Sequence, residues 1–119
     1  MKYMLLIHQG TTPTPRDPEA WNALPEAERN QVFADYKALN ETPGVEPGVQ
    51  MGEPETATTV RVQDGRTLTT DGPFVEIKEA IGGYLLFEAD DLDAAIELAS
   101  RIPAARMGGA VEIRPFFGS

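Results

Sequence analysis

The sequence contains no cysteine among its 119 residues, and this absence excludes several kinds of chemistry. Disulfide bonds, thiolate catalysis and cysteine-ligated zinc or iron–sulfur sites all need a sulfur that the chain does not have. Histidine is nearly absent too, since His8 is the only one and no motif with metal-ligand spacing accompanies it. We therefore expect neither a metal site nor a tightly bound cofactor.

Positive charge is scarce, because 10 lysines and arginines stand against 19 aspartates and glutamates and the net charge is −9. A chain this acidic is repelled by phosphate backbones and anionic lipids, so we expect no nucleic-acid partner and no membrane association. No hydrophobic run approaches the ~20 residues of a membrane span. The apolar run over residues 3–7 is shorter than the roughly 7–15 residues of a signal-peptide core, so we expect a cytoplasmic protein.

The chain does contain two segments that are apolar on both alternating sides. Its length favours a single domain, residues 1–119. A strand with two apolar sides belongs at the centre of a sheet that is covered on both faces. The two alternating sets are Tyr3, Leu5 and Ile7 against Met4 and Leu6, and Leu85 and Phe87 against Tyr84 and Leu86.

Helices and a hairpin are expected around these segments. Asp17 and Pro18 are typical of a helix start, and Asp64-Gly65 between two β-prone runs predicts a hairpin. The predicted elements are a helix over 25–40, a short strand over 49–52, hairpin strands over 58–63 and 66–70, a helix over 91–102 and a closing strand over 110–116. The apolar stripe expected on the last helix is Leu92, Ala95, Ile96, Ala99 and Ile102.

The resulting order predicts an α+β domain of ferredoxin-like βαββαβ type with an inserted β-hairpin and both helices on one face of the sheet. The second face of the central strands is also apolar, and the chain has no third layer to cover it. A second subunit that packs sheet to sheet is the simplest cover. We therefore predict a homodimer with a small-molecule site in or beside the enclosed cavity.

After the hairpin comes Asp71-Gly72-Pro73-Phe74, which continues through residues 75–84. This stretch resembles the signature of the DGPF family, a branch of the YCII-related proteins. The resemblance implies a ferredoxin-like fold of the dimeric α/β-barrel type, no settled activity and, through the genomic neighbours of bacterial members, an association with sigma factors. It extends over nearly the whole chain except roughly residues 10–22, with matches at Met1–Ile7, Thr59-Val60-Arg61, Asp64-Gly65, Asp91–Ala95, Arg101–Ala104 and Val111–Phe116.

Related YciI-type proteins are suggested to use a His–Asp pair, and this chain departs from that pattern at both positions. The histidine is expected on the first long helix, yet residues 26–40 contain none. The aspartate is expected in an Asp-Pro-Tyr element after the second helix, where this chain has Ile102-Pro103-Ala104. An enzymatic role taken from those relatives is therefore in doubt.

His8 and Asp71 are the candidate catalytic residues. His8 ends the first strand on the face assigned to the dimer cavity, where it serves either as a proton carrier or as an ordinary polar strand end. Asp71 precedes Gly72 and Pro73, which are typical of a tight turn. Its carboxylate therefore either accepts local amide hydrogens or acts as a base at the cavity mouth.

The candidate ligand-binding residues are Glu76, Lys78, Glu79 and Arg114. The first three form a charged run, which either is solvated or contacts an anionic substrate through Lys78. Arg114 either clamps a ligand carboxylate or pairs with a carboxylate across the sheet or the dimer seam, and we favour the pairing.

Two aromatic residues and a glycine pair complete the candidate list. We expect Trp21 and Phe33 to pack in the interior, with a place for Trp21 at a pocket rim as the alternative. Gly82-Gly83 follows no phosphate-loop pattern, so we expect it to allow close backbone packing.

Two functions from different classes fit these residues. The first is a non-catalytic protein that binds a metabolite or regulates a partner, and the missing His–Asp pair favours it. The second is a cofactor-independent acid–base enzyme of isomerase or lyase type, in which His8, Asp71 and a glutamate act on a small organic substrate.

Overall fold

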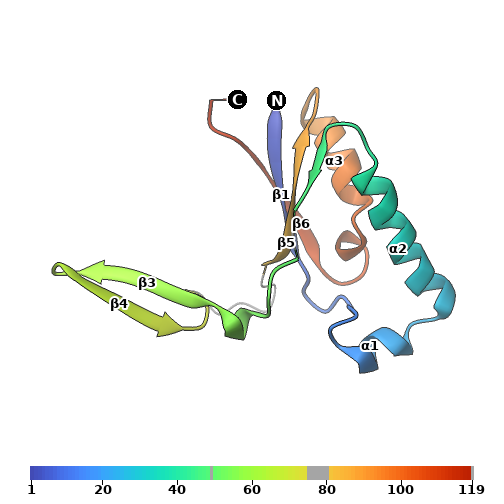
Figure 1. Ribbon diagram of the computed structural model, residues 1–119. Coiled ribbons are helices and arrows are strands. Elements are labelled where there is room, and N and C mark those ends of the chain that lie inside the picture. Colours follow the sequence, from blue (N-terminus) through green and yellow to red (C-terminus); the bar gives the residue numbers. More distant parts are fainter. Residues whose placement is uncertain (49, 75–80, 119) are drawn as a thin grey trace.

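The computed structural model describes residues 1–48, 50–74 and 81–118 (Figure 1). Six strands, three helices and two short 3-10 turns (η) make up this part of the chain. Their order is β1 (Lys2–His8), α1 (Pro18–Ala23), α2 (Glu26–Asn40), β2 (Val45–Pro47), η1 (Pro54–Thr56), β3 (Thr58–Gln63), β4 (Arg66–Asp71), β5 (Ile81–Glu88), α3 (Leu92–Ser100), η2 (Pro103–Ala105) and β6 (Ala110–Pro115). None of the helices in the described residues is long and apolar enough to cross a membrane.

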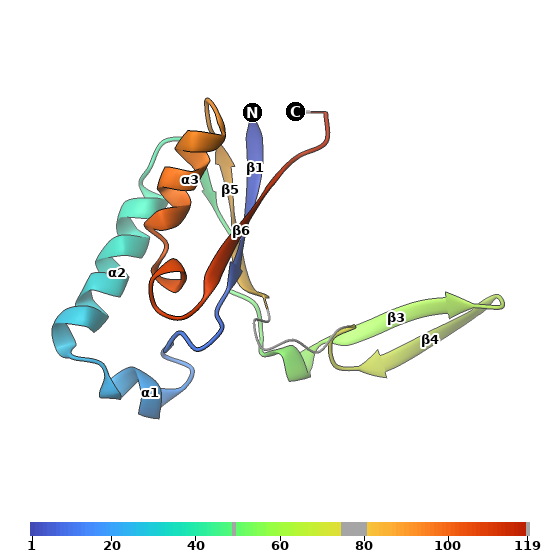
Figure 2. The ribbon, with the colours of Figure 1, turned by 180° about the vertical axis from the view of Figure 1, so that it is seen from behind.

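Four strands form the main sheet in the order β2-β5-β1-β6, and each neighbouring pair is antiparallel. Helix α2 connects β1 to β2 across β5, and α3 connects β5 to β6 across β1. Both helices lie on one face of the sheet (Figures 1 and 2). This arrangement confirms the predicted mixed α+β architecture and is consistent with a ferredoxin-like fold. The two strands with apolar residues on both sides, β1 and β5, occupy the centre of the sheet, and the closing strand β6 lies at an edge.

The core lies between the helices and the facing side of β1 and β5. Alternate residues of each central strand point into it, as the apolar pattern predicts. Four side chains at its centre are less than 2% exposed, and they come from a strand, from both long helices and from the turn after α3. They are Leu5, Leu39, Leu98 and Ile102.

Helix α3 and the turn after it bury three of the five residues predicted for the apolar stripe, namely Ala95, Ala99 and Ile102. Leu92 and Ile96, which we expected to be buried, are about half exposed, whereas Leu98 is buried. Small residues at Ala95 and Ala99 face the sheet, and the helix packs closely along that line. At about 100° per residue, Leu92 and Ile96 then fall at the edge of the buried stripe.

The short strand predicted over residues 49–52 is wrong, because the structure has no strand at 50–52, and residue 49 lies outside the described residues. The strand β2 occurs earlier, at Val45–Pro47. The backbone N–H of Glu88 donates to the Gly44 carbonyl at 2.9 Å, so pairing with β5 begins almost directly after α2 ends.

Strands β3 and β4 form a separate two-stranded hairpin, as predicted. The turn residues Asp64 and Gly65 both have positive φ, at 51° and 74°, which is the geometry that a two-residue hairpin turn of type I′ requires. The hairpin extends away from the body on the side of the sheet opposite α2 and α3 (Figures 1 and 2). The radius of gyration is accordingly 16.3 Å, against about 13.5 Å for a compact chain of this length.

Replacement of a core side chain tests the packing of this sheet against its helices. Leu5→Ala is expected to lower the free energy of unfolding by about 2–5 kcal/mol, because it leaves a cavity at the centre of the core. The matched control Leu92→Ala removes the same atoms from a half-exposed site and is expected to cost less than about 1 kcal/mol. Urea unfolding measures both, and equal losses would contradict this description of the core.

Candidate functional site

The face of the sheet that points away from the helices carries the candidate site. This face is formed by residues of three strands. Each of these residues is only partly buried or is exposed, and we call the surface the open face. Within the described residues, no helix lies on this side of the sheet (Figures 1 and 2). The open face consists of Met4, Leu6 and His8 from β1, Tyr84 and Leu86 from β5, and Glu112 and Arg114 from β6.

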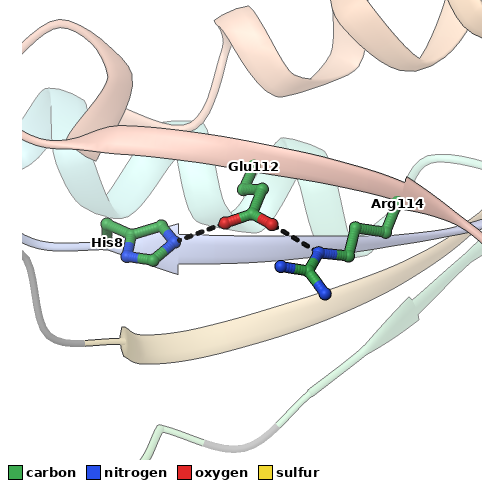
Figure 3. Close-up of polar contacts among 3 residues, drawn as sticks. All are labelled: His8, Glu112 and Arg114. Atoms are coloured by element: carbon green, nitrogen blue, oxygen red, sulfur yellow. Dashed lines mark hydrogen bonds and ion pairs between the residues drawn. The ribbon is translucent and has the colours of Figure 1, made fainter. Parts of the chain in front are cut away.

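Strand register brings three polar residues together on the open face. In the antiparallel pair β1–β6, Leu6 lies opposite Glu112 and Met4 opposite Arg114, so the even-numbered side chains of both strands share one face. His8 Nε2 lies 3.2 Å from Glu112 Oε1, and Arg114 Nε donates to the other carboxylate oxygen, Oε2 (Figure 3). One carboxylate therefore holds both the imidazole and the guanidinium.

Glu112 is the electrostatic centre of this group. The hydrogen bond from Arg114, and after it the one from His8, hold the pKa of the Glu112 carboxyl below its ordinary value. The group therefore carries a fixed negative charge at neutral pH. Its hydrogen bond with Nε2 orients the imidazole ring of His8 (Figure 3).

Arg114 retains donors that the ion pair does not use. Its Nε bonds Glu112, while the two terminal nitrogens point away from that carboxylate (Figure 3). The side chain is 69% exposed at the edge strand β6. The sequence favoured a pairing with a carboxylate across the sheet or the dimer seam, whereas the carboxylate that Arg114 meets, Glu112, lies on the same strand, β6. Within the described residues the guanidinium bonds no other side chain, and its planar fork is suited to a ligand carboxylate.

The structure brings only part of the predicted set together. His8 and Arg114 meet through Glu112, which sequence analysis did not name as a site residue. Its signal was the two-residue spacing from Arg114 on the closing strand, but the partner His8 is 104 positions away. The roles of these residues stay predictions.

Asp71 lies elsewhere, at the end of β4 on the base of the hairpin. Gly72 has the positive φ expected for it, at 100°. Its N–H donates to the Ala57 carbonyl at 2.7 Å, which continues the pairing of β3 with β4 past Asp71 and does not close a β-turn. Asp71 is exposed and lines a wide open hollow of about 910 Å³ together with Arg16 and Glu53. The other predicted ligand-binding residues, Glu76, Lys78 and Glu79, lie outside the described residues.

The side chains that bind metal ions are not grouped together in the described part of the chain. Three or more histidine, aspartate or glutamate side chains placed to share one ion do not occur there. The open face offers an imidazole, a carboxylate and a guanidinium to a ligand.

Removal of the central carboxylate tests the electrostatics of the site. Glu112→Gln is expected to lower the melting temperature at neutral pH, because it removes the charge that Arg114 and His8 bind. The folded-state pKa of Glu112 lies below its ordinary value of 4.5, so the pairing stabilises the fold above that pH and this stabilisation is lost as the pH falls through the folded-state pKa.

Thermal unfolding across the acid range measures this effect. The difference between Glu112→Gln and the original chain is expected to shrink as the pH falls below 4.5. Glu55→Gln, at an exposed residue of η1, is the matched control and should change little at any pH. A difference for Glu112→Gln that stayed constant into strong acid would contradict the ion pair.

Comparison with known proteins places this chain in a family. The YCII-related domain family matches residues 1–117, which is nearly the whole sequence. An uncharacterized protein of Rhizobium meliloti (strain 1021) is 30% identical over 120 residues, which cover 97% of this chain and 91% of that protein. The match runs through the strands that carry His8, Glu112 and Arg114. The chain belongs to the YCII-related domain family.

Proposed function

We propose that the protein is a homodimer that binds a small molecule, with two open faces packed together around the His8–Glu112–Arg114 group. One observation carries this proposal: the open face joins an apolar surface to a polar group of both charges. A soluble antiparallel sheet with one free face normally alternates apolar residues inside with polar residues outside, and β1 and β5 do not.

The apolar part of the open face supports association with a second copy. Met4, Leu6, Tyr84 and Leu86 lie next to one another on the two central strands. Contiguous apolar surface of this kind on a single chain marks an interaction site. A two-fold contact places the same patch on both subunits, so the patch must be complementary to itself. The open face meets this condition because acidic and basic groups occur together near its edges, in the ion pairs Lys2–Glu46 and Arg114–Glu112.

The hairpin supports the same partner. An isolated two-stranded hairpin is marginally stable in water, and β3 and β4 pair with no further strand in the described residues. By register, one face of the hairpin carries Val60, Val62, Thr67 and Thr69, all β-branched and uncharged. Val60 and Val62 are 58% and 68% exposed. Because the hairpin extends on the side of the open face, a second copy seated there would lie against it.

Binding without chemical change is the function that we favour for the enclosed chamber. The free guanidinium nitrogens of Arg114 would recognise an anionic or carbonyl group, and the apolar residues of β1 and β5 would hold the body of the ligand. The His–Asp pair suggested for YciI-type relatives is absent from this chain. An association with a sigma factor and membership of the DGPF branch, which the Asp71-Gly72-Pro73-Phe74 sequence favours, stay proposals too.

An acid–base enzyme is the second candidate, and the His8–Glu112 pair favours it. A carboxylate bonded to an imidazole nitrogen orients the ring and stabilises its protonated form, which is the arrangement of an imidazole that gives and takes protons. Exclusion of water by a second subunit would strengthen this pair. Such an enzyme would catalyse proton transfer in an isomerase or lyase reaction without a cofactor.

Sedimentation equilibrium tests the dimer. The chain is expected to sediment with twice the mass of one copy at micromolar concentration. Leu6→Arg places a charge in the middle of the open face and is expected to give a single-copy particle, because an unpaired charge is costly to bury. The matched control Leu92→Arg, at a half-exposed site on α3, should leave the dimer intact. A stable single-copy particle for the original chain would refute the proposal.

Deuterium exchange separates the binding function from the enzyme. The dimer is incubated in deuterated water with a mixture of small organic acids and their carbonyl analogues, and mass spectrometry measures deuterium at their C–H positions. A binding protein leaves the exchange rates at their uncatalysed values. Exchange above background would favour the enzyme if His8→Gln abolishes it and Asp71→Asn retains it. Of these two residues, only His8 contacts Glu112.

A further inference from the structure

A second cavity lies on the other side of the sheet, within one protomer. It has a volume of about 300 Å³, which is large enough for a small organic molecule. Its wall combines β1 and β5 with α1, α2 and the loop after β1. The residues that line it include Thr12, Trp21, Tyr36 and Gly83.

The wall of this cavity is mostly apolar and is uncharged. No lysine, arginine, aspartate, glutamate or histidine is among its described lining residues. Trp21 is only 9% exposed, and its ring meets Phe33 edge to face at 5.5 Å between centroids. Trp21 is therefore buried, as expected, and it also lines a pocket, which was the alternative considered for it. An interior without charge selects against ions, because nothing offsets the loss of their hydration.

The wall also carries uncharged polar side chains, and two of its hydroxyl groups matter most here. Thr12 Oγ1 is buried and has no hydrogen-bond partner in the described part of the chain. Buried polar groups are nearly always bonded, so this hydroxyl lacks a partner, and rotation of the Thr12 side chain toward the cavity that it lines would bring the hydroxyl to a ligand. Tyr36 supplies the second hydroxyl, and burial raises the pKa of its phenol, so the group is a neutral donor at physiological pH.

The floor of the cavity is a glycine with open space above it. A Cβ placed on Gly83 would meet only Ile7 Cδ1 within 4 Å, at 3.9 Å, although Gly83 itself is buried in β5. The neighbouring Gly48 is different, because a Cβ there would lie 2.0 Å from the Tyr84 carbonyl oxygen. Gly48 is thus required by backbone packing, whereas the absence of a side chain at Gly83 leaves room in the cavity.

The wide hollow at the base of the hairpin adjoins the cavity. Gln9, Thr12 and Gln50 are among the residues that line both spaces. Among the described residues, the hollow also exposes Glu53, Glu55 and Asp71, against one arginine that Glu53 pairs. An acidic hollow beside the cavity, in a chain of net charge −9, repels anions.

We propose that each protomer binds, in this cavity, a small neutral and mostly apolar molecule whose hydroxyl or carbonyl group pairs with Thr12 Oγ1. The site is complete within one chain and lies across the sheet from the His8–Glu112–Arg114 group. It is therefore distinct from the chamber proposed between two open faces, and it takes a different class of ligand. Trp21 is the only tryptophan of the chain, so its fluorescence reports on this site directly.

The test uses cyclohexanol as the probe and cyclohexanecarboxylate as its charged counterpart of similar size. Cyclohexanol is expected to change the Trp21 emission saturably, in the millimolar range typical of a ligand this small. The carboxylate is expected to bind at least about 10-fold more weakly, because its charge would be buried without a partner. Leu6→Arg, the single-copy variant, should bind cyclohexanol as the original chain does.

Three variants locate the site. Gly83→Val fills the floor and is expected to abolish the saturable change, whereas Gly83→Ala should weaken it in part. Thr12→Val keeps the shape, removes the orphaned hydroxyl and is expected to weaken binding about 5–10-fold. Thr67→Val, the same change on the exposed hairpin, is the matched control and should have no effect.

Three results would overturn the inference. They are a wild-type emission that changes only linearly with cyclohexanol, equal binding of the carboxylate, and unchanged binding in Gly83→Val that retains its native urea unfolding curve. If Gly83→Val fails to fold, Gly83→Ala and Thr12→Val decide the question, and unchanged binding in both refutes the site. Loss of binding in Leu6→Arg alone would place the probe in the dimer chamber instead.

Discussion

A sheet whose two central strands are apolar on both sides, but which has helices on only one side, is the constraint on which the rest of the structure depends. Strands β1 and β5 send alternate residues to each face, so burial of Leu5 under the helices leaves Leu6 on the open face. The hydrophobic effect acts on both faces alike. The helices α2 and α3 satisfy it on one side, and the other side is the one on which we propose that a second copy packs.

The polar group on the open face is held by backbone register rather than by a loop. Antiparallel pairing of β1 with β6 sets the positions of His8, Glu112 and Arg114, and sheet hydrogen bonds fix that pairing on both sides of β1. A charged group in an otherwise apolar contact acts as a specificity device, because a shifted register would bury its charges unpaired. In the dimer that we propose, such a group would give the two-fold interface a defined alignment as well as a place to bind a ligand.

The two faces of the sheet offer opposite chemistry to ligands. Ile7 faces the neutral cavity under α2, while the next residue along β1, His8, belongs to the open face. One face presents an ionised carboxylate with a guanidinium, and the other presents a hydroxyl within an apolar wall. A thin two-layer domain can therefore hold two unlike sites a single strand apart, without any dedicated binding domain.

The sequence alone determined the features that depend on neighbouring residues: the two-sided strands, the Asp64-Gly65 turn, and the aspartate cap of α1, whose carboxylate accepts the Ala20 N–H as expected. Only the tertiary structure decided the position of β2, the stripe that α3 buries, the meeting of His8 with Glu112 across 104 positions, and the cavity beside Trp21. The reason is physical. Turns, caps and strand alternation follow from local sterics and hydrogen bonds, whereas registers and cavities arise from the packing of segments that are distant in the chain.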